Sequence, residues 1–399
     1  MGRNPDLKQV LDKLEDYITN QDYFGYDPYD ALNSPRLHGL QSKIMRLALT
    51  VLFRRSPVNL RNLLGVEKGR NPKAIGLFLS GYSNLIAMGT PGSREKADEL
   101  FTWLASNYSQ GYSGHCWGYD FPWQNRDRLL PPGIPTVVNT AYIGHGMLDY
   151  HEATGNREAL THARSACEFI LRDLNITETD HGICFSYTPL ERNIVHNANV
   201  LGASLLARVY SHTKENELQE MATRSIDFTL HHQHDDGRWD YLIDPETGRT
   251  KDQTDWHQGF ILDSFRWYIE GVRPDDGKYL EGLRKGLKFY AAQFTPEGQG
   301  YWRYPRLWPV NIHNQAQGLV TFSRLEPYVE GSRNHAETIA KWAIEHLRSP
   351  QGYFYYQKHR FLTNRIPYMR WSQAWMFYAL STMVRTEQEG SVKAPSEKL

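Results

Sequence analysis

The chain has 399 residues, of which 40% are hydrophobic and 23% are charged, as is usual for a globular protein. Lysines plus arginines equal aspartates plus glutamates at 45 each, so we expect neither nucleic acid nor anionic lipid as a main partner. The three cysteines form no C-x-x-C pair, which argues against a disulfide framework and a structural zinc site. There is no apolar signal segment, and the apolar run near 44–53 is too short to span a bilayer. We therefore expect a cytoplasmic protein without membrane insertion.

Amphipathic helices alternate along the chain with more apolar ones. Apolar residues recur at i, i+3, i+4 and i+7 in 6–19, 94–108, 157–173, 215–232, 277–293 and 334–348. The intervening helices, such as 197–210 and 373–384, are more apolar and carry their polar groups mainly at the N-terminal end. Segment 21–36 is predicted to be an irregular link, and the polar residues 386–399 a frayed tail.

A small residue stands near the start of each apolar helix, and its spacing indicates a repeat. These residues are Ala74, Ala141, Ala198, Gly259, Ala316 and Ala374, at separations of 57 to 67 residues. Six units of nearly constant length are typical of a repeat architecture. The small residue would allow neighbouring apolar helices to approach closely.

Aromatic loops precede these helices. Five share Trp/Phe-x-Tyr with a glycine nearby: G-H-C-W-G-Y (114–119), G-I-C-F-S-Y (182–187), G-R-W-D-Y (237–241), G-Y-W-R-Y (300–304) and G-Y-F-Y-Y (352–356). Each unit is then an outer helix, an aromatic loop or short β-hairpin, and an inner helix. The pattern predicts an all-α fold, an (α/α)6 toroid of six helical hairpins with these loops at a funnel mouth. We expect residues 1–385 to form this single domain and 386–399 the tail.

The N-terminal ends of the inner helices should open into this funnel, where free N–H groups favour anionic ligands. Carboxylates, tyrosines and imidazoles there are candidates for general acid–base catalysis. The best single candidate is Asp255, in T-D-W-H-Q-G-F, although an aspartate at a helix start can equally serve as an N-cap. The candidate catalytic residues are Asp255, Tyr304, Glu191, Asp120, Asp252 and His257.

The other polar and aromatic residues predicted to face the funnel suit a sugar. Aromatic rings stack on the apolar faces of sugars, and arginines pair with uronate carboxylates. The candidate substrate-binding residues are Trp117, Tyr119, Tyr187, Arg192, His196, Asn197, Trp239, Tyr241, Trp256, Gln258, Arg306, Trp308, His313, Gln315, Tyr356, Arg365, Tyr368, Arg370 and Trp371. Arg126 and Asp127 are expected nearby.

Two plainer interpretations apply to these residues. The Trp-x-Tyr repeat can be a packing device between units, because aromatic rings favour buried contacts. His196, His257 and His313 recur at similar positions, but no H-E-x-x-H or comparable ligand spacing occurs, so we expect no metal and no other cofactor.

The six helical units with Gly-x-Trp loops resemble the carbohydrate-active (α/α)6 enzymes: unsaturated glucuronyl hydrolases, N-acylglucosamine 2-epimerases and the helical domain of D-glucuronyl C5-epimerases. H-N-Q-A-Q-G-L (313–319) is similar to a helix start of the C5-epimerases, in which tyrosines are implicated in proton transfer at C5. The resemblance makes Tyr304, Tyr356 and Tyr368 candidates here. Y-D-P-Y-D-A-L-N-S-P (26–35) and R-S-P-V-N-L-R (55–61) resemble proteins encoded near bacterial exopolysaccharide biosynthesis genes.

These features together indicate an enzyme that acts on a uronate-containing polysaccharide or oligosaccharide, in exopolysaccharide synthesis or modification. Either C5 epimerisation or lyase chemistry by proton abstraction, or glycoside hydrolysis, fits the residues. One alternative is a non-catalytic glycan-binding scaffold associated with polysaccharide-synthesis proteins. Another is a terpene-cyclase-like toroid, since Gln233-x-x-x-Gly237-x-Trp239 fits a Gln-Trp repeat, although no D-x-D-D motif follows.

Overall fold

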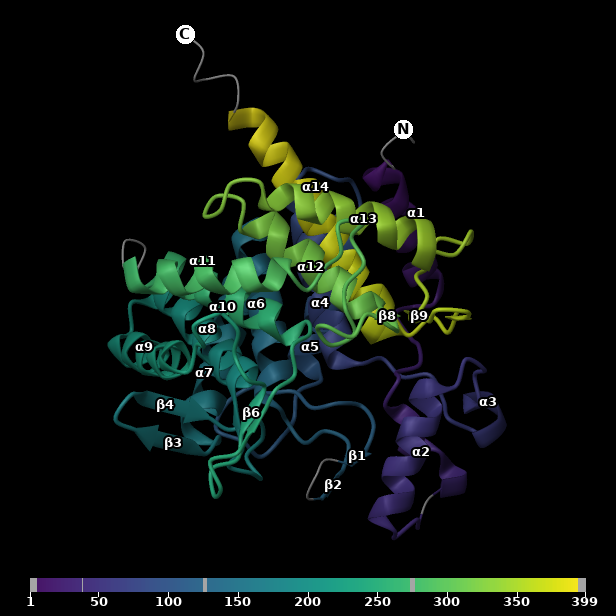
Figure 1. Cartoon of the computed structure of the whole chain (residues 1–399), viewed down its shortest axis with the longest axis horizontal. Helices are drawn as coiled ribbons and strands as arrows, with labels where there is room; N and C mark the ends of the chain where they lie inside the picture. Colours follow the sequence, from purple (N-terminus) through teal and green to yellow (C-terminus); the bar gives the residue numbers. More distant parts are fainter. Residues whose placement is uncertain (1–5, 38, 125–127, 273–276, 394–399) are drawn as a thin grey trace.

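The computed structural model describes residues 6–393, apart from 38, 125–127 and 273–276 (Figure 1). Six inner helices form the centre, and each packs on the next in sequence. Contacts between α14 and α4 close the ring. The inner helices are α4 (Pro72–Ala87), α6 (Val137–Thr154), α8 (His196–Thr213), α10 (His257–Gly271), α12 (Ile312–Arg324) and α14 (Trp375–Lys393).

Six outer helices surround this ring, and each packs against an inner helix. They are α1 (Leu7–Asn20), α5 (Ser93–Ser106), α7 (Arg157–Arg172), α9 (Asn216–His231), α11 (Gly277–Ala291) and α13 (Ser332–Leu347). The predicted (α/α)6 toroid is therefore confirmed. The predicted small residues Ala74, Ala141, Ala198, Gly259, Ala316 and Ala374 are all buried.

Short antiparallel strands join the units, most of them in the lower half of Figure 1, where the inner helices begin. Two hairpins stand alone: β1 (Trp123–Gln124) with β2 (Leu129–Leu130), and β3 (Ile176–Thr179) with β4 (Gly182–Phe185). Two three-stranded sheets each connect neighbouring units. They are β5 (Ile194–Val195), β6 (Leu242–Ile243) and β7 (Thr250–Lys251), and then β8 (Val310–Asn311), β9 (Gln357–Lys358) and β10 (Thr363–Asn364).

Amide side chains on the inner helices hold the aromatic loops in place. The Gln258 side chain accepts a hydrogen bond from the main-chain N–H of Trp239 at 3.0 Å and donates to its carbonyl at 2.7 Å. Gln373 holds Phe354 in the same way, with both distances 2.8 Å. The clamp fixes Trp239, whose indole is buried, at a set place in the loop, two residues before Tyr241.

The fifth unit has a different register from the one that its sequence suggests. The Gln315 side chain accepts a hydrogen bond from the main-chain N–H of Gly300 at 2.8 Å and donates to the carbonyl of Gly298 at 2.7 Å. Gly300 therefore occupies the place that Trp239 holds in the fourth unit. A Cβ atom on Gly300 would lie 2.6 Å from the Gln315 side-chain oxygen, which explains the glycine. Trp302, rather than Tyr304, is therefore the counterpart of Tyr241.

Residues 21–71 form a side lobe instead of a simple link. It contains the 3₁₀ turns η1 (Asp30–Asn33) and η2 (Pro35–Leu37) and the helices α2 (Lys43–Arg55) and α3 (Arg61–Leu64). A buried ion pair between Arg61 and Asp30, at 2.6 Å, holds the lobe together. Arg370 of the toroid pairs with Asp27 of the lobe through two bonds of 2.6 and 2.8 Å and so fixes the lobe to the toroid. The two motifs of 26–35 and 55–61 thus contact each other through Asp30 and Arg61.

The C-terminal boundary also differs from the prediction. A π-helical turn, η3 (Met369–Ala374), leads into α14, which continues as a helix to Lys393. The stretch after 385 was predicted to fray because it is polar. Its residues instead favour helix, and Arg385 and Glu389 form an i,i+4 ion pair at 2.8 Å.

Candidate functional site

Side chains from several units meet in a ring around the N-terminal ends of the inner helices. Trp371 lies 5.4 Å from Tyr29 and 5.8 Å from Trp256, measured between ring centroids. Trp256 lies 5.3 Å from His257, which in turn meets Tyr241 edge-on at 4.8 Å. Half of the ring therefore comes from the side lobe and from units four and six.

Tyrosines and an arginine close the other half. Burial raises the pKa of Tyr187, and the nearby Tyr241 raises it further. Tyr187 also forms a hydrogen bond with Tyr119. The Arg370 guanidinium lies 5.0 Å from the Tyr119 ring and 5.2 Å from the Trp371 ring. We call this set the funnel ring: Tyr29, Tyr119, Tyr187, Tyr241, Trp256, His257, Arg370 and Trp371.

His313 lies inside the funnel ring, at its floor. Its imidazole is 4.5 Å from both Trp371 and Trp375, and Phe260 stacks on Trp375. Burial, with the nearby charges of Lys73 and Arg370, lowers the pKa of His313 well below its usual value. Neither ring nitrogen has a hydrogen-bond partner within normal geometry among the described residues. His313 is therefore a buried, neutral imidazole.

Lys73 adds a buried amino group beside His313. It is buried at the start of α4, with its ammonium 4.4 Å from the Tyr142 ring and 5.4 Å from the Trp375 ring. Burial lowers the pKa of Lys73 well below its ordinary value, and the Arg370 charge adds to this. Among the described residues it makes no salt bridge within 4.0 Å. Burial thus disfavours the ammonium form, and an anionic ligand beside Lys73 would favour it.

Asp255 and His257 form a hydrogen-bonded dyad. Nδ1 of His257 lies 2.5 Å from Oδ1 of Asp255, which is 1% exposed, whereas His257 is 16% exposed. Gln253 donates to the other Asp255 oxygen at 3.0 Å and accepts from Arg303 at 3.0 Å. A carboxylate only accepts, so Nδ1 carries the proton and Nε2 is the basic nitrogen. The dyad thus presents the His257 imidazole as a base, and Asp255 holds that imidazole in position.

Several buried polar atoms near the starts of the inner helices lack partners. Both side-chain polar atoms of Asn139, Oδ1 of Asn197, Nδ2 of Asn311 and Oγ of Ser372 make no hydrogen bond within the described chain. An unsatisfied buried polar group costs about 1–3 kcal/mol, so such groups call for a ligand or water. These atoms could bond a ligand that enters the funnel.

Asp120 lies behind the ring in a small cavity beside Asn71 and Arg370. Asn71 donates a hydrogen bond to Asp120 at 2.5 Å. Burial raises the pKa of Asp120 to about 6, so this carboxyl group takes up a proton more readily than an exposed aspartate.

Other predicted residues lie at the rim. Glu191 lines a cavity of about 510 Å³ together with Tyr187, Tyr241 and Trp123. Asp252 is exposed and pairs with Arg238 at 3.2 Å. Tyr304, Trp308 and three predicted arginines also lie outside the funnel ring. Tyr304 is exposed, and its ring centroid lies 6.0 Å from that of Phe289. Trp308 is half-buried, and the exposed arginines are Arg192, Arg306 and Arg365.

A last group is used for packing, as the plainer interpretation allows. The indoles of Trp117 and Trp239 are buried and bond main-chain carbonyls, and Tyr368 accepts from Arg61 at 3.0 Å. His196 packs against α9, 5.8 Å from Phe228, and burial lowers its pKa to about 3. Tyr356 is buried, and Gln258 and Gln315 are clamps. Arg126 and Asp127 lie outside the described residues.

Sequence reasoning missed three residues in or near the funnel. Lys73 directly precedes the small residue Ala74, just as Gln258 directly precedes the small residue Gly259. The repeat of small residues could therefore have identified Lys73. Trp302, whose ring lies 6.1 Å from that of Trp256, was missed because the sequence motif aligned Tyr304 with Tyr241. Tyr29 comes from the side lobe, and no repeat pattern points to it.

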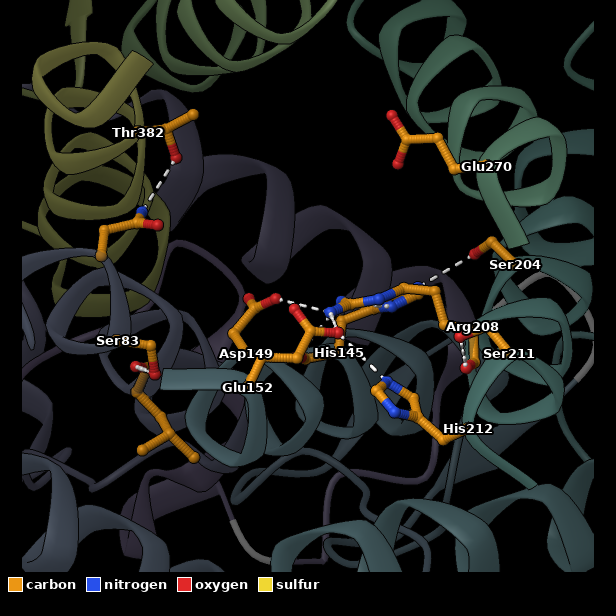
Figure 2. Close-up of polar contacts among 12 residues, drawn as sticks. Ser83, His145, Asp149, Glu152, Ser204, Arg208, Ser211, His212, Glu270 and Thr382 are labelled. Carbon is orange, nitrogen blue, oxygen red and sulfur yellow. Dashed lines mark hydrogen bonds and ion pairs between the residues drawn. The ribbon is translucent and has the colours of Figure 1, made fainter. Parts of the chain in front are cut away.

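The opposite mouth of the toroid holds a second cavity, of about 580 Å³. Figure 2 shows Asp149 and Glu152 at the guanidinium group of Arg208, where both pair with the same nitrogen at 2.9 Å. His145 lies nearby and is hydrogen-bonded to Ser204 at 2.9 Å. Five arginines and five acids line this cavity. Cations near helix carboxyl ends stabilise them, so these paired charges have a structural explanation. The funnel is the better candidate site.

In sequence, the chain matches no family model and no curated protein. Solved structures resemble it over nearly its whole length. A cellobiose 2-epimerase from Bacillus thermoamylovorans superposes with a TM-score of 0.65 at 12% identity, covering 96% of this chain and 99% of that one. A possible member of glycoside hydrolase family 105 from Salmonella enterica gives 0.65 at 13% identity, with coverages of 97% and 96%.

A polysaccharide lyase gives a TM-score of 0.60 at 11% identity, with coverages of 98% and 99%. The chain has the toroid fold of these proteins. At such identities the similarity concerns the fold alone, so the reaction has to be argued from the residues of the funnel.

Proposed function

We propose that the chain is a carbohydrate-active enzyme that abstracts a proton from a uronate-containing glycan. The observation that carries this is the Asp255–His257 dyad within a ring of aromatic residues. Aromatic walls suit sugar faces, and the dyad supplies a positioned base. The toroid neighbours described as epimerase, hydrolase family member and polysaccharide lyase support a glycan as substrate.

Two imidazoles in one site suit epimerisation. His257 and His313 each lie 5.3 Å from the Trp256 ring, measured between centroids. For inversion at C5, one group removes the proton from one face of the sugar and another returns a proton to the opposite face. In the lyase variant, the same carbanion expels the oxygen at C4, which leaves protonated.

The buried Lys73 supports a uronate. Deprotonation at C5 places negative charge on the substrate carboxylate, and a fixed cation stabilises that charge in the transition state. Lys73 needs an anionic partner, and Arg370 is already neutralised by Asp27. The resemblance of 26–35 and 55–61 to proteins encoded near exopolysaccharide biosynthesis genes supports, in this proposal, a glycan of exopolysaccharide synthesis or modification.

Product analysis on a panel of uronate glycans tests the proposal. Epimerisation gives C5-inverted sugars without chain cleavage, and a lyase gives unsaturated non-reducing ends; either result supports proton abstraction. New reducing ends paired with saturated non-reducing ends would show hydrolysis and contradict it. Glycan binding with no product from any member of the panel would favour the non-catalytic scaffold.

A further inference from the structure

The side lobe carries an exposed apolar helix face. In α2, Ile44, Leu47, Ala48, Val51 and Leu52 follow the i, i+3, i+4, i+7, i+8 spacing of one helix face. All five are exposed, with Ile44 79% and Leu52 52% accessible. The opposite side of the helix buries Phe53 against Ala31 and Val66. An amphipathic surface helix has its apolar side inward, so the arrangement here requires a partner.

Basic residues are frequent in the lobe that carries this face, although the whole chain is neutral. Segment 36–70 contains eight basic residues and one acid, Glu67. Arg61 and Arg70 are paired with acids elsewhere in the chain, which leaves six basic residues against one acid. The six are Arg36, Lys43, Arg46, Arg54, Arg55 and Lys68. The partner should therefore be apolar at its centre and negatively charged around it.

We propose that α2 lies on an anionic lipid bilayer, with Ile44, Leu47, Val51 and Leu52 in the interface and the exposed Lys43 and Arg55 at the headgroups. This combination of apolar face and basic flank is what binds a helix parallel to a membrane. In the described part of the chain no helix is both long and apolar enough to cross one, so this is docking on the surface. The proposal does not depend on the reaction in the funnel.

The charges argue against a second copy as the partner. In a two-fold symmetric dimer the same patch meets itself, so Lys43 and Arg55 of both copies would gather in one interface. An anionic surface neutralises them instead. The lobe also touches the funnel side of the toroid, because Arg46 donates to Gln124 of β1 at 2.8 Å. Docking through α2 would thus bring that side near the bilayer.

Flotation of the full-length protein with vesicles tests this. We expect it to float with vesicles of phosphatidylcholine and phosphatidylglycerol, and about tenfold less with phosphatidylcholine alone. Ile44→Asp/Leu52→Asp should lose at least about tenfold of this binding, whereas Ile44→Leu/Leu52→Met should keep it. Because these side chains are exposed, thermal unfolding should be unchanged.

Variants with altered charge provide a second test in the same flotation experiment. Lys43→Glu/Arg55→Glu should weaken binding to the anionic vesicles, whereas Lys278→Glu/Lys285→Glu on α11 makes the same change in charge and should not. Flotation that survives Ile44→Asp/Leu52→Asp would overturn the proposal, as would no flotation with either vesicle. A dimer that the same double substitution dissociates, without vesicle binding, would also overturn it and identify a second copy as the partner.

Discussion

Oδ1 of Asp255 lies 2.5 Å from Nδ1 of His257, and this contact orients the imidazole toward the funnel. The first prediction is that Asp255→Asn lowers turnover about 10²–10⁴-fold, the range typical of general acid–base groups. An asparagine can donate to Nδ1 and so stabilise the wrong tautomer. Steady-state kinetics on the glycan identified by product analysis measures the loss.

Asp252→Asn is the matched control for that variant. Asp252 is three residues away but exposed, and it pairs with Arg238 at the rim. Its turnover should stay close to that of the wild type. Equal losses in the two variants would show that the dyad has no special role.

The buried ammonium of Lys73 gives the second prediction. Lys73→Met keeps the length of the side chain but removes the charge, so affinity for a uronate glycan should fall about 10- to 100-fold, the worth of a charged hydrogen bond. Affinity for the corresponding neutral glycan should hardly change. Isothermal titration with both glycans makes the comparison, and an equal fall for both would argue against a carboxylate beside Lys73.

The third prediction concerns the clamp between Gln258 and Trp239. Gln258→Ala leaves one buried N–H and one buried carbonyl without partners, which should lower the free energy of unfolding by about 2–5 kcal/mol. Urea denaturation measures it. Gln9→Ala, at an exposed position of α1, should change stability by less than about 0.5 kcal/mol. A small effect at Gln258 would mean that the loop holds its position without the clamp.

The fourth prediction uses the pH dependence of the cluster at the opposite mouth. Burial alone would raise the pKa of Glu152, but Arg208 and His212 lower it to about 2. A carboxyl group whose pKa is lowered on folding stabilises the protein above its unfolded pKa, near 4.5, and loses that effect as pH falls toward 2.

Thermal unfolding of the wild type and of Glu152→Gln therefore should differ most above pH 5, with the variant melting lower. The difference should shrink steadily between pH 4.5 and pH 3. A difference that is constant across this range would show that the ionised carboxylate is not the stabilising form.

The toroid could be predicted from the sequence because its signals are local and repeated. Helical periodicity and the small residues from Ala74 to Ala374 recur six times, and the structure confirms the units they define. The His257 position was found because it shares a helix start with Gly259 in this column. Repetition thus identified the end of the toroid at which the candidate site lies.

What the sequence could not predict depends on contacts between distant segments. Which aromatic residue of G-Y-W-R-Y faces the funnel depends on the clamp at Gln315, 15 residues away from Gly300. The place of Tyr29 depends on buried ion pairs that fold 21–71 into a lobe. The balanced charge of the whole chain likewise gave no sign of the basic surface around α2.

The most direct test of the account is exchange of the C5 proton of a uronate glycan in D2O, followed by NMR for the wild type and for His257→Gln. We predict that deuterium enters at C5, or that unsaturated ends form, with the wild type, and that both are lost in a folded His257→Gln protein. Deuterium entering equally with the variant would contradict His257 as the base. No exchange and no elimination with any uronate glycan, in a correctly folded wild type, would contradict the proposed reaction.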